Sequence, residues 1–269
     1  MKMFASDLDR TLIFSRRALA EFGQAEECEL LCVERKDDQD VAFMKKKAFK
    51  LLKEIAANLL FVPVTTRTYE QFNRIFPLSE DIVLPYAVTS NGANIIHDGK
   101  PLIEWNDFVQ KQLRDDCACL VEMVKNLEEL KLNGTLKIAE DLFFYYILNE
   151  PITIPVINRI KAIAIHNGWR VSIQGRKLYV MPKPISKGAA IRYIKEKHGI
   201  KTVYGAGDSI LDYDFLQLCD VAYIPIHGEL VKENILNAPF IVTEQKGVKA
   251  GEEVLRNIAN TLKLAASIC

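Results

Sequence analysis

The chain has 269 residues, and its 35 Lys and Arg residues balance 35 Asp and Glu residues, so the formal net charge is zero. Hydrophobic residues make up 49% of the chain, which is enough for a globular core without metal or disulfide staples. The balanced charge excludes the long-range field of a general nucleic-acid binder, and no apolar run is as long as a membrane span. The acidic N-terminal segment does not resemble a secretory signal, so we expect a cytoplasmic protein with six reduced cysteines.

Four short apolar runs have the character of buried parallel strands, and each ends in polar residues that can carry chemistry. These runs are residues 2–5, 59–64, 86–89 and 202–205. Amphipathic patterns with helical spacing occupy residues 44–57, 186–198 and 247–263. Strands that alternate with helices indicate βαβ units. The sequence therefore predicts a doubly wound, Rossmann-like α/β fold.

The middle of the chain follows a different pattern, in which two strand pairs flank a helix. The predicted elements are a helix at 106–128, strands at 136–139 and 143–148, a helix at 153–167, and strands at 170–172 and 177–180. This order predicts a separate α+β domain over residues 105–181, inserted into a core made of residues 1–104 and 182–269. A smaller insertion, predicted as a hairpin, occupies residues 15–43.

Aspartates follow the first and the last of the four predicted strands. Asp7 and Asp9 come directly after the first strand, whereas Asp208 and Asp212 lie in a glycine-containing turn after the last one. In open α/β sheets, ligands bind beyond the carboxyl ends of the strands. Carboxylate oxygens suit Mg2+, so we predict a metal site at this edge; solvated turns with an Asp N-cap are the alternative.

Hydroxyl and ammonium groups are predicted at the same edge of the sheet. Thr65 ends the second strand, and Lys187 lies in the first turn of its helix, where a cation opposes the helix dipole and so requires a nearby anion. The alternatives are a helix N-cap at Thr65 and a solvated lysine. Thr11 could meet a phosphate through its hydroxyl or amide. Together these groups can hold a cation and a phosphoryl group, with a carboxylate aimed at phosphorus.

Four segments resemble, in order, the four motifs of the haloacid dehalogenase (HAD) superfamily. They are Asp7-Leu8-Asp9-Arg10-Thr11-Leu12, Thr65-Thr66-Arg67, Ser186-Lys187-Gly188, and Gly207-Asp208-Ser209 with Asp212. Ser90-Asn91-Gly92-Ala93 is similar to the segment that precedes the cap domain in the branch whose cap lies between motifs two and three. That branch includes Cof-type sugar-phosphate phosphatases and sucrose-phosphate phosphatase. The resemblance implies a HAD core with an inserted α+β cap that confers specificity.

The resemblance also implies a role for each site residue. Asp7 would be the nucleophile that forms an aspartyl-phosphate, and Asp9 would protonate the leaving oxygen and then activate water. Thr65 and Lys187 would hold and neutralise the phosphoryl group. Mg2+ would bind Asp7, Asp208 and the carbonyl of Asp9, with Asp212 as a further ligand or as a partner of the ligands. The residues of the core predicted to bind substrate are Thr11, Thr66, Arg67 and Asn91. Independently of the resemblance, the turn at 174–177 of the cap holds donors suited to sugar hydroxyls or a second anion, so Arg176 is also predicted to bind substrate, with a solvated β-turn as the alternative.

We therefore predict a Mg2+-dependent phosphatase that hydrolyses a small phosphorylated sugar or related metabolite, as a monomer or homodimer. Two alternatives are a phosphomutase or phosphotransferase on the same scaffold and a non-catalytic ligand-binding homologue. His227 stands where relatives often have a Gly-Asn-Ala segment, and we favour a structural role for it. Arg16 and Arg17 follow the first motif, so either could reach a phosphorylated substrate.

Overall fold

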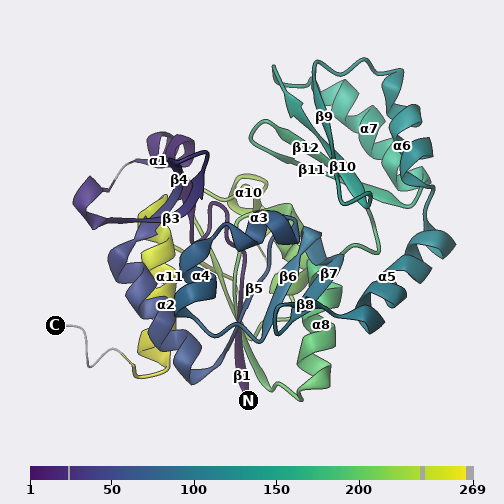
Figure 1. Ribbon diagram of the computed structural model, residues 1–269. Helices are drawn as coiled ribbons and strands as arrows, with labels where there is room; N and C mark the ends of the chain where they lie inside the picture. Colours follow the sequence, from purple (N-terminus) through teal and green to yellow (C-terminus); the bar gives the residue numbers. More distant parts are fainter. Residues whose placement is uncertain (24, 237–239, 265–269) are drawn as a thin grey trace. The chain divides into compact units, whose positions relative to one another are not determined.

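The computed structural model describes residues 1–23, 25–236 and 240–264, which pack into two compact units (Figure 1). Unit 1 combines Met1–Lys100 with Lys187–Cys269, and unit 2 is Pro101–Ser186. The predicted cap, 105–181, lies within unit 2, whose bounds are a few residues wider at each end. Five of the six cysteines are free thiols, and the sixth, Cys269, lies outside the described residues.

The sheet of unit 1 has five parallel strands in the order β15-β14-β13-β1-β5. The strands are β1 (Lys2–Ser6), β5 (Leu60–Pro63), β13 (Thr202–Ala206), β14 (Val221–Ile224) and β15 (Phe240–Val242). From β1 the chain crosses to β5 on one side, whereas from β13 it continues through β14 and β15 on the other. The strand order therefore reverses between β1 and β13. This parallel sheet confirms the predicted α/β class.

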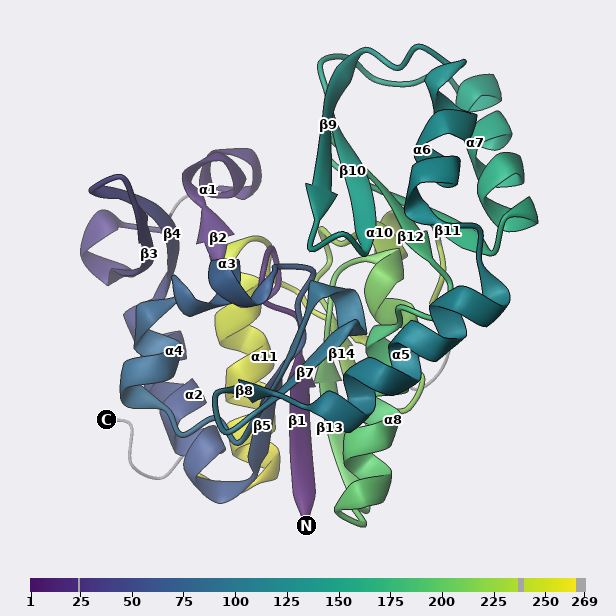
Figure 2. The ribbon, with the colours of Figure 1, turned by 45° about the vertical axis from the view of Figure 1, so that its right-hand side comes forward.

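Helices cover both faces of this sheet (Figures 1 and 2). On one face α2 (Lys46–Asn58) packs against α11 (Val248–Thr261), and their apolar stripes join the sheet side chains Phe4 and Phe61 in one core. Helix α8 (Lys187–Lys197) lies on the other face, and α9 (Tyr213–Leu216) packs against α8 and β13. Close packing there requires a glycine, because a Cβ on Gly205 would lie 2.5 Å from the Cys219 sulfur.

Shorter elements complete unit 1. The helices are α1 (Arg16–Phe22), α3 (Tyr69–Asn73), α4 (Phe76–Asp81) and α10 (Glu229–Lys232), and three single turns of 3-10 helix are η1 (Glu27–Glu29), η2 (Ser90–Gly92) and η3 (Ile210–Asp212). A second sheet has the order β6-β7-β8, with β6 (Tyr86–Thr89), β7 (Asn94–His97) and β8 (Lys100–Pro101). The amide of Thr65 donates to the Val88 carbonyl, which ties the end of β5 to β6.

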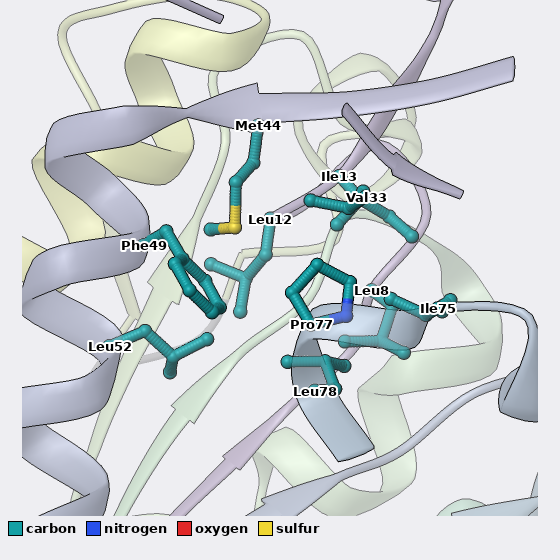
Figure 3. Close-up of a pocket in the computed structure, with 10 residues that line it drawn as sticks. All are labelled: Leu8, Leu12, Ile13, Val33, Met44, Phe49, Leu52, Ile75, Pro77 and Leu78. Carbon is teal, nitrogen blue, oxygen red and sulfur yellow. The ribbon is translucent and has the colours of Figure 1, made fainter. Parts of the chain in front are cut away.

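The predicted hairpin is present as β3 (Leu30–Lys36) and β4 (Gln39–Lys45), and β2 (Phe14–Ser15) pairs with β4. Its two-residue turn, Asp37-Asp38, has φ of 50° and 58°, as type I′ hairpin turns require. Apolar side chains pack the hairpin against the rest of unit 1. They line a small pocket formed by Leu8, Leu12, Ile13, Val33, Met44, Phe49, Leu52, Ile75, Pro77 and Leu78 (Figure 3).

Unit 2 is built on an antiparallel sheet in the order β11-β12-β10-β9. Its elements are α5 (Ile103–Asp116), α6 (Leu120–Glu128), β9 (Gly134–Ala139), β10 (Phe143–Leu148), α7 (Ile154–His166), β11 (Trp169–Gln174) and β12 (Lys177–Pro182). Within the described ranges no helix has both the length and the apolar composition of a membrane span.

The prediction of one continuous helix over 106–128 is wrong, because α5 ends at Asp116 and α6 begins at Leu120. The residues between them bond to the segment before β11. The Ala118 amide donates to the Asn167 carbonyl, and the indole N–H of Trp169 donates to the Ala118 carbonyl at 2.9 Å. The helical pattern continues through this region, but these contacts between distant residues use backbone groups that a continuous helix would need.

Candidate active site

Asp7 lies at the carboxyl end of β1, beside the point where the strand order reverses. Its amide donates to the Ala206 carbonyl of β13 at 2.8 Å, so the neighbouring strand fixes its backbone. Its carboxylate accepts hydrogen bonds from Lys187 at 2.7 Å and from the Thr11 hydroxyl at 3.2 Å. Burial raises the pKa of Asp7 to about 7, and Lys187 opposes that shift. Thr11 therefore contacts the predicted nucleophile directly.

Lys187 is the buried cation of the site, with 1% of its surface exposed. Its ammonium group donates to Asp7 Oδ1 and, at 2.5 Å, to Asp212 Oδ1. Although burial acts to lower the pKa of Lys187, the two carboxylates outweigh that effect and raise it. The anion that a lysine in a first helical turn requires is thus supplied by residues from two other segments.

Asp212 organises the turn after β13. One of its oxygens accepts from the backbone amides of Asp208 and Ser209, at 3.1 and 2.9 Å, and from the Ser209 hydroxyl at 2.8 Å. Its other oxygen accepts from Lys187. A Cβ on Gly207 would lie 2.6 Å from the Asp212 Cβ, so this turn closes only around a glycine. Hydrogen bonds therefore engage both oxygens of Asp212.

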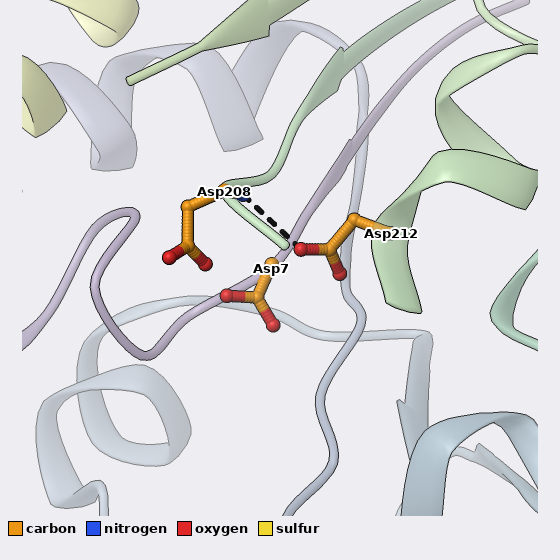
Figure 4. A group of neighbouring side chains, drawn as sticks. All are labelled: Asp7, Asp208 and Asp212. Carbon is orange, nitrogen blue, oxygen red and sulfur yellow. Dashed lines mark hydrogen bonds between the residues drawn. The ribbon is translucent and has the colours of Figure 1, made fainter. Parts of the chain in front are cut away.

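Asp208 brings a third carboxylate to the same place (Figure 4). One oxygen of each of Asp7, Asp208 and Asp212 lies within 4.8 Å of the others, and all three residues are buried. Burial and the neighbouring carboxylates raise the pKa of Asp208 well above its ordinary value, while Arg10, 3.8 Å away, counteracts them weakly. Three oxygen donors with this surplus of negative charge fit Mg2+, a hard cation that prefers oxygen ligands.

Asp9 faces a different partner. Its carboxylate accepts two hydrogen bonds from the guanidinium of Arg67, at 2.7 and 2.8 Å, in the bidentate geometry that makes such pairs strong. Arg67 also donates to Glu34 of β3 at 2.8 Å. The predicted substrate ligand Arg67 is thus engaged with protein carboxylates. The sequence did not point to Glu34, because it opens the charged run Glu34-Arg35-Lys36 at the end of β3, which resembles the solvated end of a hairpin strand.

Thr65 is fully buried at the end of β5, and its hydroxyl accepts from the Arg67 amide at 3.1 Å. The amide of Asn91 donates to the Thr65 carbonyl at 2.9 Å. This bond holds the turn after β6, in which Asn91 has φ of 59°, against the second motif. Thr66, between Thr65 and Arg67, is partly exposed. Backbone hydrogen bonds therefore join the turn that contains Asn91 to the second motif.

His227 lies behind the loop that follows Asp7. Its Nδ1 accepts from the Gly247 amide, which leaves Nε2 to donate to the Arg10 carbonyl at 2.8 Å. Burial lowers the pKa of His227 to about 4. Arg10 has φ of 66°, a conformation that favours glycine, and the histidine holds its carbonyl in place. These contacts agree with a structural role.

The remaining predicted residues have local partners. Arg16 donates to the Asp40 carbonyl at 3.2 Å and stacks on Phe43. It lines an open, polar concavity of the hairpin together with Arg17. Arg176, in unit 2, donates through Nε to the Leu148 carbonyl at 2.8 Å. Substrate binding by these arginines stays a prediction.

Comparison with known proteins identifies the family. Residues 1–224 match the model of the family described as sucrose-6F-phosphate phosphohydrolase. The chain belongs to that family. This match confirms the predicted place in the HAD superfamily and the predicted enzyme class, a phosphatase.

A phosphoglycolate phosphatase from Staphylothermus marinus is similar over a short segment. The two proteins are 40% identical over 50 residues, which is 18% of this chain. The matched segment spans only about a fifth (21%) of that relative's length.

Solved structures share the fold of the whole chain. The sucrose-phosphatase from Synechocystis sp. PCC6803, in complex with sucrose and phosphate, has a TM-score of 0.69 at 15% identity and covers 96% of both chains. A HAD subclass IIB sugar phosphatase has a TM-score of 0.65 at 13% identity, covering 98% of this chain and 100% of its own. A HAD-like hydrolase from Bacillus subtilis has a TM-score of 0.55 at 17% identity, covering 99% and 92%. These likenesses establish the fold.

The burial of His227 generates a pH prediction. A pKa of about 4 in the folded state, against 6.5 unfolded, means that the unfolded chain binds the extra proton as the pH falls from about 7 to 4. Stability is therefore fully present above pH 6.5 and is lost below it, with a decrease on the order of 2 kcal/mol between pH 7.5 and 5. Urea unfolding of wild type and His227→Gln measures it. The variant should lose less stability over this interval; parallel curves would contradict the assignment.

Proposed function

We propose that the protein is a Mg2+-dependent phosphomonoester hydrolase that acts on a small phosphorylated sugar through an aspartyl-phosphate on Asp7. One observation carries the proposal. A buried aspartate lies at the switch point of the sheet, hydrogen-bonded to a buried lysine and clustered with two further carboxylates. Phosphoryl transfer requires little beyond such positioning and charge neutralisation.

Each residue has a defined part in the proposed reaction. A carboxylate oxygen of Asp7 attacks phosphorus, and the P–O bond to the leaving group breaks as the aspartyl-phosphate forms. Asp9 gives its proton to the leaving oxygen. In the second half, Asp9 takes a proton from water, the water oxygen attacks phosphorus, and the bond to Asp7 breaks to release inorganic phosphate. Atoms and protons balance over one turnover, with Asp9 restored to its starting state.

Lys187 orients Asp7 and supplies positive charge where the phosphoryl oxygens would lie. The hydroxyl of Thr65 and the amides of the loop after Asp7 are suited to donate to the same oxygens. Asp7 and Asp208, with the carbonyl of Asp9, would hold Mg2+, and Asp212 would keep the turn in place. The bound cation would neutralise charge on the phosphoryl group.

The sugar-phosphate class is supported by the family and by a pair of aromatic rings on the unit 2 sheet. The rings of Tyr145 and Tyr179 lie 5.3 Å apart, and the Lys177 ammonium lies 5.6 and 5.9 Å from their centres. Ligand sites commonly combine aromatic faces with a few polar groups. The sucrose-phosphatase of similar fold was solved with sucrose and phosphate. We propose that unit 2 discriminates among leaving groups, because the phosphoryl group is common to all substrates.

A screen of phosphorylated metabolites, with and without Mg2+, tests the function directly. We expect inorganic phosphate to be released from one or more sugar phosphates in the presence of Mg2+. Transfer to a second hydroxyl without phosphate release would identify a mutase or phosphotransferase instead. Binding of a sugar phosphate with no turnover would identify a non-catalytic homologue.

Asp7→Asn tests the nucleophile. The substitution keeps the shape of the side chain but removes the attacking charge, so kcat should fall at least about a thousandfold, or on the order of 4 kcal/mol of barrier. Steady-state kinetics on the best sugar phosphate measures the loss. Asp81→Asn, an exposed aspartate paired with Lys53, is the control and should retain wild-type rates. Activity of Asp7→Asn within about tenfold of wild type would exclude the covalent mechanism.

Chelation tests the metal. Activity should disappear with EDTA and return with Mg2+, because the cluster offers only oxygen ligands. Binding to the folded state alone should also raise the melting temperature as Mg2+ is added. Asp208→Asn should abolish that rise, measured by differential scanning fluorimetry, without unfolding the protein. Full activity after exhaustive chelation would remove the metal from the proposed function.

Arg176→Ala tests discrimination by unit 2. We expect kcat/KM for the sugar phosphate to fall about 10- to 100-fold, the scale of a charged hydrogen bond of roughly 1.5–3 kcal/mol. Hydrolysis of p-nitrophenyl phosphate should change little. Arg159→Ala, an exposed arginine of α7, is the matched control. Since Arg176 also bonds to Leu148, equal losses on both substrates together with a lower melting temperature would assign it a purely structural role.

A further inference from the structure

Glu34 is a buried carboxylate on the inserted hairpin, with 4% of its surface exposed. The pairing of β3 with β4 is irregular on both sides of Glu34, with register shifts between Cys32 and Glu34 and between Glu34 and Arg35. Val33 and Glu34 are consecutive and both are buried, so both faces of β3 are covered at this point. Irregular pairing of this kind can re-aim a side chain. The carboxylate of Glu34 therefore lies inside unit 1 at the irregular part of the hairpin.

Two arginines from another segment of unit 1 receive this carboxylate. Glu34 Oε2 accepts from Arg67 Nη1 at 2.8 Å, and Oε1 accepts from Arg74 Nε at 3.0 Å. Both oxygens of Glu34 are thus paired with arginines of unit 1. Burial of a charge costs free energy unless the charge is paired and hydrogen-bonded. The two arginines therefore offset the cost of burying the Glu34 carboxylate.

Arg67 connects Glu34 to the proposed acid and base. Its Nε and Nη2 bind the two oxygens of Asp9, while Nη1 binds Glu34 at 2.8 Å and the Gln71 carbonyl at a longer 3.4 Å. The side chain of Asp9 is 44% exposed, whereas that of Arg67 is 12% exposed. A half-exposed carboxylate depends on its partner for orientation, and that partner is itself held by the hairpin.

We propose that Glu34 is a positioning residue for Asp9, acting through Arg67. The inference rests on the proposed function, because it assigns the orientation of the residue that protonates the leaving oxygen. With Glu34 in place, the Arg67 guanidinium has one orientation, and Asp9 is held in the plane of that fork. Without Glu34, Arg67 keeps only the long bond to the Gln71 carbonyl besides its pairing with Asp9, and the two side chains lose their fixed orientation. The inserted hairpin thereby takes part in catalysis without touching the substrate.

The test uses leaving groups that differ in their need for a proton. Glu34→Gln keeps the volume and one acceptor but removes the charge. For a sugar phosphate, whose alkoxide requires protonation, single-turnover formation of the phosphoryl-enzyme should slow at least about tenfold, with little change in KM. For p-nitrophenyl phosphate, whose phenolate leaves unprotonated, the same step should change less than about threefold. Rapid quench with radiolabelled substrate measures both.

A double-mutant cycle tests the route through Arg67. If Glu34 acts only by fixing that arginine, Glu34→Gln combined with Arg67→Ala should be no slower than Arg67→Ala alone, within about twofold. Arg35→Ala is the matched control, because this neighbouring residue pairs with Asp40 on the exposed side of the hairpin. It should retain wild-type rates on both substrates. Glu34→Asp, which keeps the charge on a shorter side chain, should lose less than Glu34→Gln and serves if that variant does not fold.

The outcomes separate the two proposals. Losses that are equal for the two leaving groups, or that multiply in the double mutant, overturn the positioning role while the phosphatase function stands. A wild-type protein that releases no phosphate from any monoester with Mg2+ overturns the proposed function, and the role of Glu34 in catalysis with it. A selective loss on the sugar phosphate that disappears in the Arg67→Ala background supports Glu34 as a positioning residue.

Discussion

The buried ammonium group of Lys187 lies between the carboxylates of Asp7 and Asp212 at the point where the strand order of the sheet reverses. The carboxylate of Asp208 lies nearby. Burying these charges is costly unless each has a partner, and the surrounding structure supplies the partners. The backbone of Asp7 is held by β13, and the turn after β13 closes around Gly207. The surplus of carboxylates raises the pKa of Asp7 and of Asp208. A cation at this place would relieve that surplus.

A second set of charges begins at Asp9, two residues after Asp7. Asp9, Arg67, Glu34 and Arg74 form a chain of ion pairs that joins the first motif to the second and both to the hairpin. The two sets have different environments. Asp7 and Lys187 are almost fully enclosed, whereas the side chain of Asp9 is 44% exposed. In the proposed reaction, the enclosed Asp7 would bond to phosphorus, and the more accessible Asp9 would exchange protons with the leaving group and water.

Contacts between uncharged groups also hold the loop after Asp7, which contains Arg10. His227 binds the Arg10 carbonyl and the Gly247 amide, and the ring of Phe22 lies 4.3 Å from the imidazole. The loop is therefore held from the end of β14, from the start of α11 and from the hairpin insertion. Arg10, in a left-handed conformation, is tolerated because these neighbours hold its backbone.

The sequence by itself determined the α/β class, the strands that carry Asp7, Thr65 and Asp208, and the residue types at the ends of those strands. It did so because strand periodicity and the residues that follow a strand are local properties. Only the tertiary structure decided the partners. The pairing of Asp9 with Arg67 joins residues 58 positions apart, and Glu34 meets its arginines only where the hairpin packs against the second motif. The break between α5 and α6 depends on hydrogen bonds to Asn167 and Trp169. Contacts of this kind leave no periodic signal, because their free energy exists only once distant segments are packed together.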